Sequence, residues 1–171
     1  MENSSEIFKL EKAIWNELDY EKMEWHDCSI HGIAFERREN EWGTDLIFDI
    51  DYIFQWVKPK PPEKSFSFWV APCTLVFKDV FGLKMDIDMQ GSSLQERLEI
   101  ASLNLVEKIE REKGVITYRW NLELQEGAIK FESYGYDQIV RQKPLHISGQ
   151  QLSLEQRKNI NFRQIPATGP F

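Results

Sequence analysis

The longest pattern in the chain is an alternation of large apolar residues with other residues between Asp45 and Val57. Successive side chains of a strand point to opposite faces, so a period of two predicts a strand with one apolar face. Asp49 and Asp51 occupy the intervening positions, and we expect them on the opposite face, in water. The apolar positions are Leu46, Phe48, Ile50, Tyr52, Phe54 and Trp56.

Residues 23–38 predict a second long strand, which a turn at 39–43 joins to 45–57 in a hairpin. Centring this hairpin near Glu41 sets Ile33 opposite Asp49 and His31 opposite Asp51. In that register, small residues of the first strand share a face with the large apolar residues of the second. These small or slender residues are Cys28, Ile30, Gly32 and Ala34.

Further strands follow from the same pattern. Residues 65–71 predict a short strand that ends at Pro72, because proline cannot donate to a central ladder. An alternation over 75–89 would span roughly 50 Å as one straight strand, so we expect a bend at 79–82. Residues 96–111 suit a strand or a helix, and the strand is favoured because a turn leads directly into the next strand.

The hairpin over 115–133 has the clearest alternation in the second half of the chain. Glu126 lies at its turn. A pairing of Leu124 with Ile129 and of Leu122 with Phe131 keeps the apolar residues on one face.

Two helices are expected, one near each end. Residues 4–18 carry apolar residues at helical spacing, and Asn3 followed by Glu6 resembles a capping box. We expect this helix to pack on the sheet. Ser153 and Gln156 form a second capping box, which predicts a short helix near 154–159.

Together these elements predict a mainly β fold, α+β by content. It is an antiparallel meander of about seven to nine strands that forms a curled sheet, a sandwich or a barrel. Residues 1–160 are expected to form a single β-rich domain. Residues 161–171, which contain two prolines and a glycine, are expected to be a flexible tail.

The charge of the chain is unevenly distributed. Residues 1–57 contain 14 acidic and 5 basic residues, a net −9, while residues 58–171 contain 14 and 16, a net +2. An acidic N-terminal third disfavours nucleic-acid binding, which uses clustered Lys and Arg. It fits a basic protein partner, or a solvated acidic face that aids solubility.

The sequence suggests a cytoplasmic protein with no membrane span. It has only two cysteines, Cys28 and Cys73, and no signal peptide, which favours free buried thiols in a reducing compartment. No apolar run approaches the ~18 residues that a membrane helix needs.

Trp25-His26-Asp27-Cys28 is one candidate site. Its His-Asp pair resembles the dyad of metal-dependent phosphohydrolases. Neighbouring side chains in a strand point to opposite faces, however, so one metal ion could not easily bind both. A structural His26 in or near the core is the favoured interpretation.

Carboxylates form a second candidate. If their strands were neighbours, Asp49 and Asp51 would meet Asp86 and Asp88, and four carboxylates could bind a divalent cation or serve in acid–base catalysis. The favoured interpretation is a solvated strand face. His31 near Asp51 would form an ion pair, and no nucleophile motif accompanies it.

Aromatic residues such as Trp56 could line a pocket or an interface, although core packing is the default. The chain has no P-loop, no dinucleotide-binding glycine motif and no zinc-binding cysteine pair, so no catalytic residue, metal or cofactor is predicted. The candidate binding residues are Trp25, His26, Asp27, His31, Asp49, Asp51 and Trp56.

Several strings, 25–30, 49–53, 69–77 and 120–124, resemble a family of small bacterial proteins of unknown function. The His-Asp-x-x-Ile string at 26–30 is also similar to one near the start of some immunity proteins of bacterial toxin systems. That resemblance implies a cytosolic, non-catalytic protein that binds and blocks a toxin.

The leading hypothesis is therefore a non-catalytic binding module, immunity-like, that recognises a protein partner through its acidic face. The alternatives are a β-barrel carrier of a small ligand, and a metal-dependent hydrolase that uses His26, His31, Asp27, Asp49 or Asp51.

Overall fold

The computed structural model describes residues 7–39, 42–90 and 98–168. It is mainly β, as the sequence predicts, with ten strands in one antiparallel sheet. The strands are β1 Ile14–Asn16, β2 Ser29–Arg37, β3 Thr44–Val57, β4 Ser67–Phe77, β5 Phe81–Ile87, β6 Leu98–Glu110, β7 Ile116–Leu124, β8 Gly127–Ser133, β9 Tyr136–Val140 and β10 Leu145–Ile147. The helical segments are η1 Glu17–Lys22, η3 Glu112–Gly114 and α1 Leu154–Arg157.

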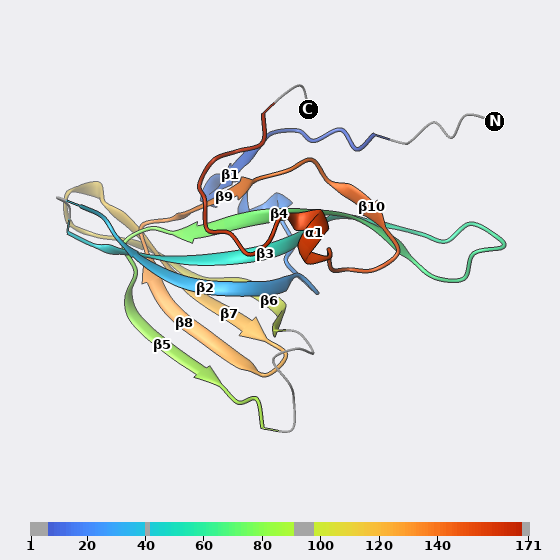
Figure 1. Cartoon of the computed structure of the whole chain (residues 1–171). Helices are drawn as coiled ribbons and strands as arrows, with labels where there is room; N and C mark the ends of the chain where they lie inside the picture. Colours follow the sequence, from blue (N-terminus) through green and yellow to red (C-terminus); the bar gives the residue numbers. More distant parts are fainter. Residues whose placement is uncertain (1–6, 40–41, 91–97, 169–171) are drawn as a thin grey trace.

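The sheet is curled rather than closed. Its strand order is β1-β9-β4-β3-β2-β6-β7-β8-β5, and β10 pairs with β4 beside this path. The strands β6, β7, β8 and β5 fold beneath the first half of the sheet, as Figure 1 shows. β1 and β5 stand at the two ends of the order and do not pair. Of the three expected architectures the curled sheet is confirmed, and the closed barrel is wrong.

An aromatic core fills the space between the two halves. Phe77 of β4 contacts Phe131 of β8, with ring centroids 4.6 Å apart, and Trp120 of β7 lies 5.6 Å from Tyr136 of β9. These rings come from opposite halves of the sheet, so their contacts pack the two halves against each other. Burial of such large side chains is the main source of stability here.

β3 is buried on both faces. Phe48 and Ile50 point into the aromatic core, whereas Ile47 packs with Val76 and Ile139 on the other face. The C-terminal segment covers that second face, with Phe162 packed against the Ile47 cluster. The alternation of β3 thus marks two buried faces, where one buried face was expected.

The β2–β3 hairpin forms, but its register differs from the predicted one by two residues at Ser29–Ile30 and by one residue from Gly32 onward. Ile33 lies opposite Phe48 rather than Asp49, and Ser29 rather than His31 lies opposite Asp51. A bulge between Ile30 and Gly32 causes the change. An extra residue in one strand inverts the faces beyond it. Ile30 therefore lies on the core face as predicted. Gly32 does not, because a Cβ at this position would point towards Phe162 on the other face.

The predicted N-terminal helix is wrong over the described residues 7–16, and residues 17 and 18 begin the short helix η1. Ile14–Asn16 forms β1, which pairs with β9, and Asn16 then caps the short helix η1 with Asp19. Leu18, an expected member of the apolar stripe, is exposed. The proposed cap at 3–6 lies outside the described residues.

The remaining strands agree with the sequence in part. The bend expected at 79–82 is confirmed between β4 and β5, and β6 confirms the strand at 98–110. The strand expected to end at Pro72 instead continues to Phe77. The carbonyl of Pro72 accepts a hydrogen bond from the backbone N–H of Arg141. Pro72 lies between the residues of β4 that pair with β9 and those that pair with β10, so its missing N–H removes no hydrogen bond from either pairing.

The β7–β8 hairpin keeps its predicted apolar face with a different register. Leu124 lies opposite Gly127 and Leu122 opposite Ile129, a shift of two residues from the prediction. A shift by two preserves the face of every side chain, because the period of a strand is two. The apolar pattern therefore could not separate the two registers.

The C-terminal helix is confirmed as α1, with the capping box of Ser153 and Gln156. After it, where the sequence predicts a flexible tail, residues 161–168 run against the second face of the sheet. Thr74 of β4 donates a hydrogen bond to the carbonyl of Arg163, and Ala167 donates to the carbonyl of Val140.

Candidate functional site

Asp49 and Asp51 lie beneath the C-terminal segment, and both are 0 % exposed. The expectation that they face water is therefore wrong. The physical reason is that the segment from Leu152 to Phe162 covers this face of β3, where its Arg157 and the more distant Arg141 pair with the carboxylates. A buried carboxylate is stable only when it is paired and hydrogen-bonded.

Asp49 accepts four hydrogen bonds. Arg141, which directly follows β9, donates to Oδ1 at 2.6 Å. Arg157 of α1 donates to Oδ1 at 2.7 Å and to Oδ2 at 2.8 Å. The backbone N–H of Asn161 donates to Oδ2 at 2.8 Å. Each oxygen of this carboxylate therefore has two donors.

Asp51 accepts three more bonds. The Nε of Arg157 donates to Oδ1 at 3.1 Å, and the N–H of Leu152 donates to Oδ2 at 2.9 Å. The Nε2 of His31 lies 2.9 Å from the same Oδ2. The predicted proximity of His31 and Asp51 is thus confirmed, although the bulge in β2 produces it.

The electrostatics of this cluster favour the charged forms. Burial alone would raise the pKa of Asp49, but hydrogen bonds from Arg157 and Arg141 outweigh it and hold that pKa below its usual value. Burial would likewise lower the pKa of Arg157, and the two carboxylates raise it instead. These hydrogen bonds anchor the C-terminal segment to β3. They occupy both carboxylate oxygens of Asp49, so neither oxygen is free to bind a substrate or a metal ion.

The four-carboxylate cluster of the sequence analysis does not form. Asp86 lies on β5 and Asp88 just after it, and four strands stand between β3 and β5 in the sheet order. Among the residues that the structure describes, no three His, Cys, Asp or Glu side chains stand close enough to share a metal ion.

Trp25, His26 and Asp27 precede β2 in a turn and point to different places. Trp25 is buried in the core, where its Nε1 donates to Gln138 at 2.8 Å. His26 is exposed at the surface, so the expectation of a core histidine is wrong. Asp27 has a φ of 62° and accepts a hydrogen bond from Gln150 at 2.9 Å.

His26 belongs to a surface cluster of rings around Trp56. The two rings stack with centroids 6.4 Å apart, and Trp56 also contacts Phe66 and Phe68 edge-on at 6.0 and 5.0 Å. Trp56 is 43 % exposed and Phe66 42 % exposed. Large aromatic side chains with this exposure are typical anchors of binding surfaces.

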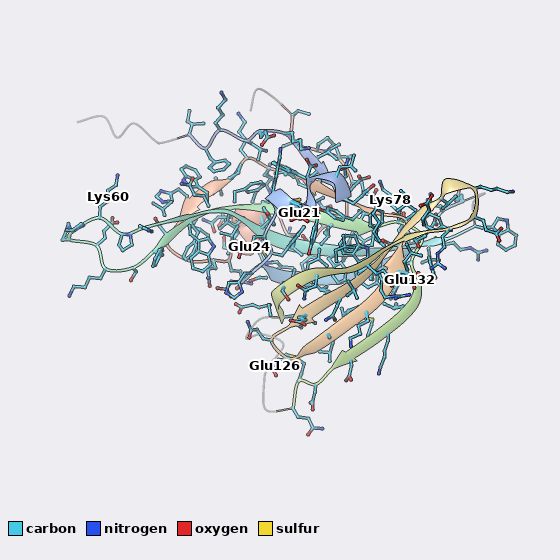
Figure 2. The ribbon with its side chains drawn as sticks, turned by 180° about the vertical axis from the view of Figure 1, so that it is seen from behind. Glu21, Glu24, Lys60, Lys78, Glu126 and Glu132 are labelled. Atoms are coloured by element: carbon cyan, nitrogen blue, oxygen red, sulfur yellow. The ribbon has the colours of Figure 1, made fainter. Side chains whose placement is uncertain are left out.

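A groove of about 520 Å³ lies beside this cluster, between the β3–β4 loop and the end of β10. We call it the hairpin groove. Figure 2 shows Lys60 in the loop that projects from the body of the molecule. The residues that line the groove are Val57, Lys58, Lys60, Glu63, Lys64, Ser65, Phe66, Ser67, His146, Ile147 and Ser148.

The hairpin groove is mainly cationic. Three lysines line it against one glutamate, and His146 is stacked on Trp69 with centroids 4.9 Å apart. Nε2 of His146 also lies 2.7 Å from the hydroxyl of Ser67. In the sequence, residues 58–64 lie between two predicted strands and contain three prolines, which is typical of a loop. Their signal was three lysines among three prolines, flanked by Trp56 and Phe66.

The acidic bias of the N-terminal third has an explanation within the fold. Asp49 and Asp51 are neutralised by Arg141 and Arg157, which lie outside that third of the chain. Recognition of a basic partner by an acidic face stays a prediction. Part of the negative charge on which it depends is paired with arginines inside the molecule.

Comparison of the chain with protein-family models, with curated proteins and with solved structures finds no match. The resemblances to a family of small bacterial proteins and to immunity proteins therefore stay predictions. In the described part of the chain, no helix has the length and apolar character to cross a membrane.

Proposed function

We propose that this protein is a non-catalytic binding module that holds an acidic protein segment in the hairpin groove. The observation that carries the proposal is the combination of three lysines with two half-exposed aromatic rings, Trp56 and Phe66, on one projecting hairpin. Lysines attract carboxylates, while the rings offer apolar area to the side chains between those carboxylates.

A non-catalytic role is supported by the state of the reactive groups. The carboxylates of Asp49 and Asp51 are buried and hydrogen-bonded to arginines. Cys28 and Cys73 are free but buried, and burial raises the pKa of Cys28 to about 12. Such a thiol is protonated at neutral pH and is a poor nucleophile.

A protein segment suits the groove better than a nucleic acid does. The chain carries a net charge of −7, which repels a long polyanion approaching from solution. Glu63 also lines the groove. A short segment with a few carboxylates would meet the lysines of the loop without facing the rest of the acidic surface.

The test is binding of the purified full chain to an array of short peptides of random sequence. We expect enrichment of Asp and Glu beside apolar residues, and binding that weakens as salt rises. Reversal of the three groove lysines should weaken the selected peptides at least about tenfold, equivalent to about 1.4 kcal/mol. That variant is K58E/K60E/K64E.

Matched controls separate the groove from net charge and from general stickiness. The charge control reverses three exposed lysines outside the groove, K9E/K108E/K113E, and should bind as the unaltered chain does. Trp56→Ala should weaken binding, whereas alteration of the exposed Trp42 to Ala should not. Equal loss in both triple variants, no acidic enrichment, or tighter binding to a single-stranded oligonucleotide would each overturn the proposal.

A further inference from the structure

β5 forms one end of the sheet and carries an exposed apolar row. Among the described strands it pairs with β8 alone, and Figures 1 and 2 both show it at the outer margin of the curled half. Met85 lies opposite Ile129 and Ile87 opposite Gly127 of β8, and Leu83, two positions before Met85, lies at the bulge between Phe81 and Lys84. Leu83 is 36 % exposed and Met85 40 % exposed. An edge strand of this kind is a template for another strand.

The opposite face of β5 carries two charges of opposite sign, those of Lys84 and Asp86. Lys84 and Asp86 are exposed, and neither forms an ion pair within the described part of the chain. Lys84 also lies directly opposite Lys130 of β8. Like charges in directly opposed positions destabilise a strand pair. Asp86, Asp88 and Glu126 line the same hollow as the two lysines, and a carboxylate placed directly opposite Lys84 on the free side of β5 would add a further attraction.

The sequence of β5 is complementary to itself when it is read antiparallel about Met85. The residues from 83 to 87 read Leu-Lys-Met-Asp-Ile. We propose that a second copy of this chain pairs with β5 through its own β5, with Met85 on the two-fold axis. Lys84 of each copy then faces Asp86 of the other, and Leu83 faces Ile87.

This register satisfies both faces of the edge at once. It forms two symmetric ion pairs on the outer face, each adding a carboxylate beside the Lys84–Lys130 pair. On the other face it covers Leu83, Met85 and Ile87 with the same residues of the second copy. Two-fold pairing is the commonest symmetry of protein dimers, and directly opposed side chains in such a pair lie about 5 Å apart.

The charges also explain why this edge would accept a copy of itself rather than any strand. A lysine in an edge strand discourages pairing with unrelated strands, because its charge has no partner there. The aspartate two positions later removes this penalty for a strand aligned on Met85. A shift of register by one residue places Lys84 opposite Met85 or Ile87, so the charges select one alignment.

The test is the mass of the full chain by sedimentation equilibrium, with charge-reversal variants of the two residues. The unaltered protein should form a dimer of twice 20.3 kDa. K84E sets Glu opposite Asp86, and D86K sets Lys opposite Lys84, so each variant should dimerise at least about tenfold more weakly. An equimolar mixture of the two should form heterodimers, since both contacts between them join opposite charges.

A double variant and a control variant complete the test of this dimer. The double variant K84E/D86K should dimerise as the unaltered chain does, and the control K108E, an exposed lysine on β6, should leave the dimer unchanged. A monomeric unaltered protein, single variants that dimerise normally, or single variants that fail to combine in the mixture would each overturn the proposal. Because complementation requires two folded chains, heterodimer formation also shows that neither variant is unfolded.

Discussion

Arg157 donates a hydrogen bond to each oxygen of Asp49, at 2.7 and 2.8 Å, although 108 positions separate the two residues. The same guanidinium donates through Nε to Asp51. All three side chains are 0 % exposed. One arginine of a four-residue helix therefore ties the C-terminal segment to two positions of the longest strand in the sheet.

Arg157→Met should destabilise the protein strongly. The substitution removes the cation and leaves the buried carboxylates of Asp49 and Asp51 with fewer donors, which costs about 3–5 kcal/mol. Urea unfolding followed by tryptophan fluorescence measures the loss. Lys158→Met, a change of the exposed neighbouring residue, is the control and should alter stability by less than about 0.5 kcal/mol. A similar small effect in both variants would show that Arg157 does not anchor this segment.

Stability should fall in acid because of Asp49. Its pKa is lower in the folded protein than in the unfolded chain, where the pKa is about 4. At pH values between these two, the unfolded state binds more protons. The contribution of Asp49 is therefore complete above about pH 4 and is lost as the pH falls through its folded pKa.

Urea midpoints measured from neutral pH downwards test this contribution. Arg157→Met should move the loss to higher pH, because the lowering of the pKa depends on hydrogen bonds from that arginine. An unfolding free energy that stays constant down to about pH 2, or an unchanged acid limb in the variant, would contradict the assignment.

The position of Asp49 shows what a local pattern can and cannot predict. The alternation in residues 45–57 predicts a strand correctly, because side-chain period is a property of the strand alone. What covers its second face depends on a segment about one hundred residues away. One local signal was available: Ile47 and Ile53 share the face of the aspartates, and a solvated face would not need them.

The charge imbalance carried a second signal. The net −9 in residues 1–57 fits either a surface for a basic partner or a solvated acidic face. Part of the imbalance instead reflects complementarity within the chain, since Arg141 and Arg157 supply the charges that Asp49 and Asp51 need. Composition by segment cannot distinguish an internal from an external partner. Registers were missed for a similar reason, since the apolar pattern does not reveal the bulge that brings His31 to Asp51.

The two cysteines should be unreactive in the native protein. The free buried thiols predicted from the sequence are confirmed, and burial raises the pKa of both Cys28 and Cys73. Ellman's reagent reacts with the thiolate, so we expect no rapid reaction at neutral pH and reaction of both thiols in denaturant. Rapid labelling of the native protein would show that this part of the core opens readily.

Gly127 should be the least replaceable of three glycines that differ in their surroundings. It has a φ of 147°, and a Cβ there would lie 2.0 Å from the backbone carbonyl oxygen of Asp86. Gly127→Ala therefore combines an unfavourable conformation with a clash that a side chain cannot relieve. We expect a loss of about 3 kcal/mol in the free energy of unfolding, together with weaker pairing of β5 and β8.

Two other glycines separate these contributions. Gly114 has a φ of 74° with open space around it, so its change to Ala should cost about 1 kcal/mol from conformation alone. Gly149 has neither a positive φ nor a close neighbour, and its change should stay within about 0.5 kcal/mol. If the three variants unfold at the same urea concentration, β5 does not approach β8 as closely at Gly127 as the structure places it. The edge that β5 offers to a second copy would then also differ from the one described.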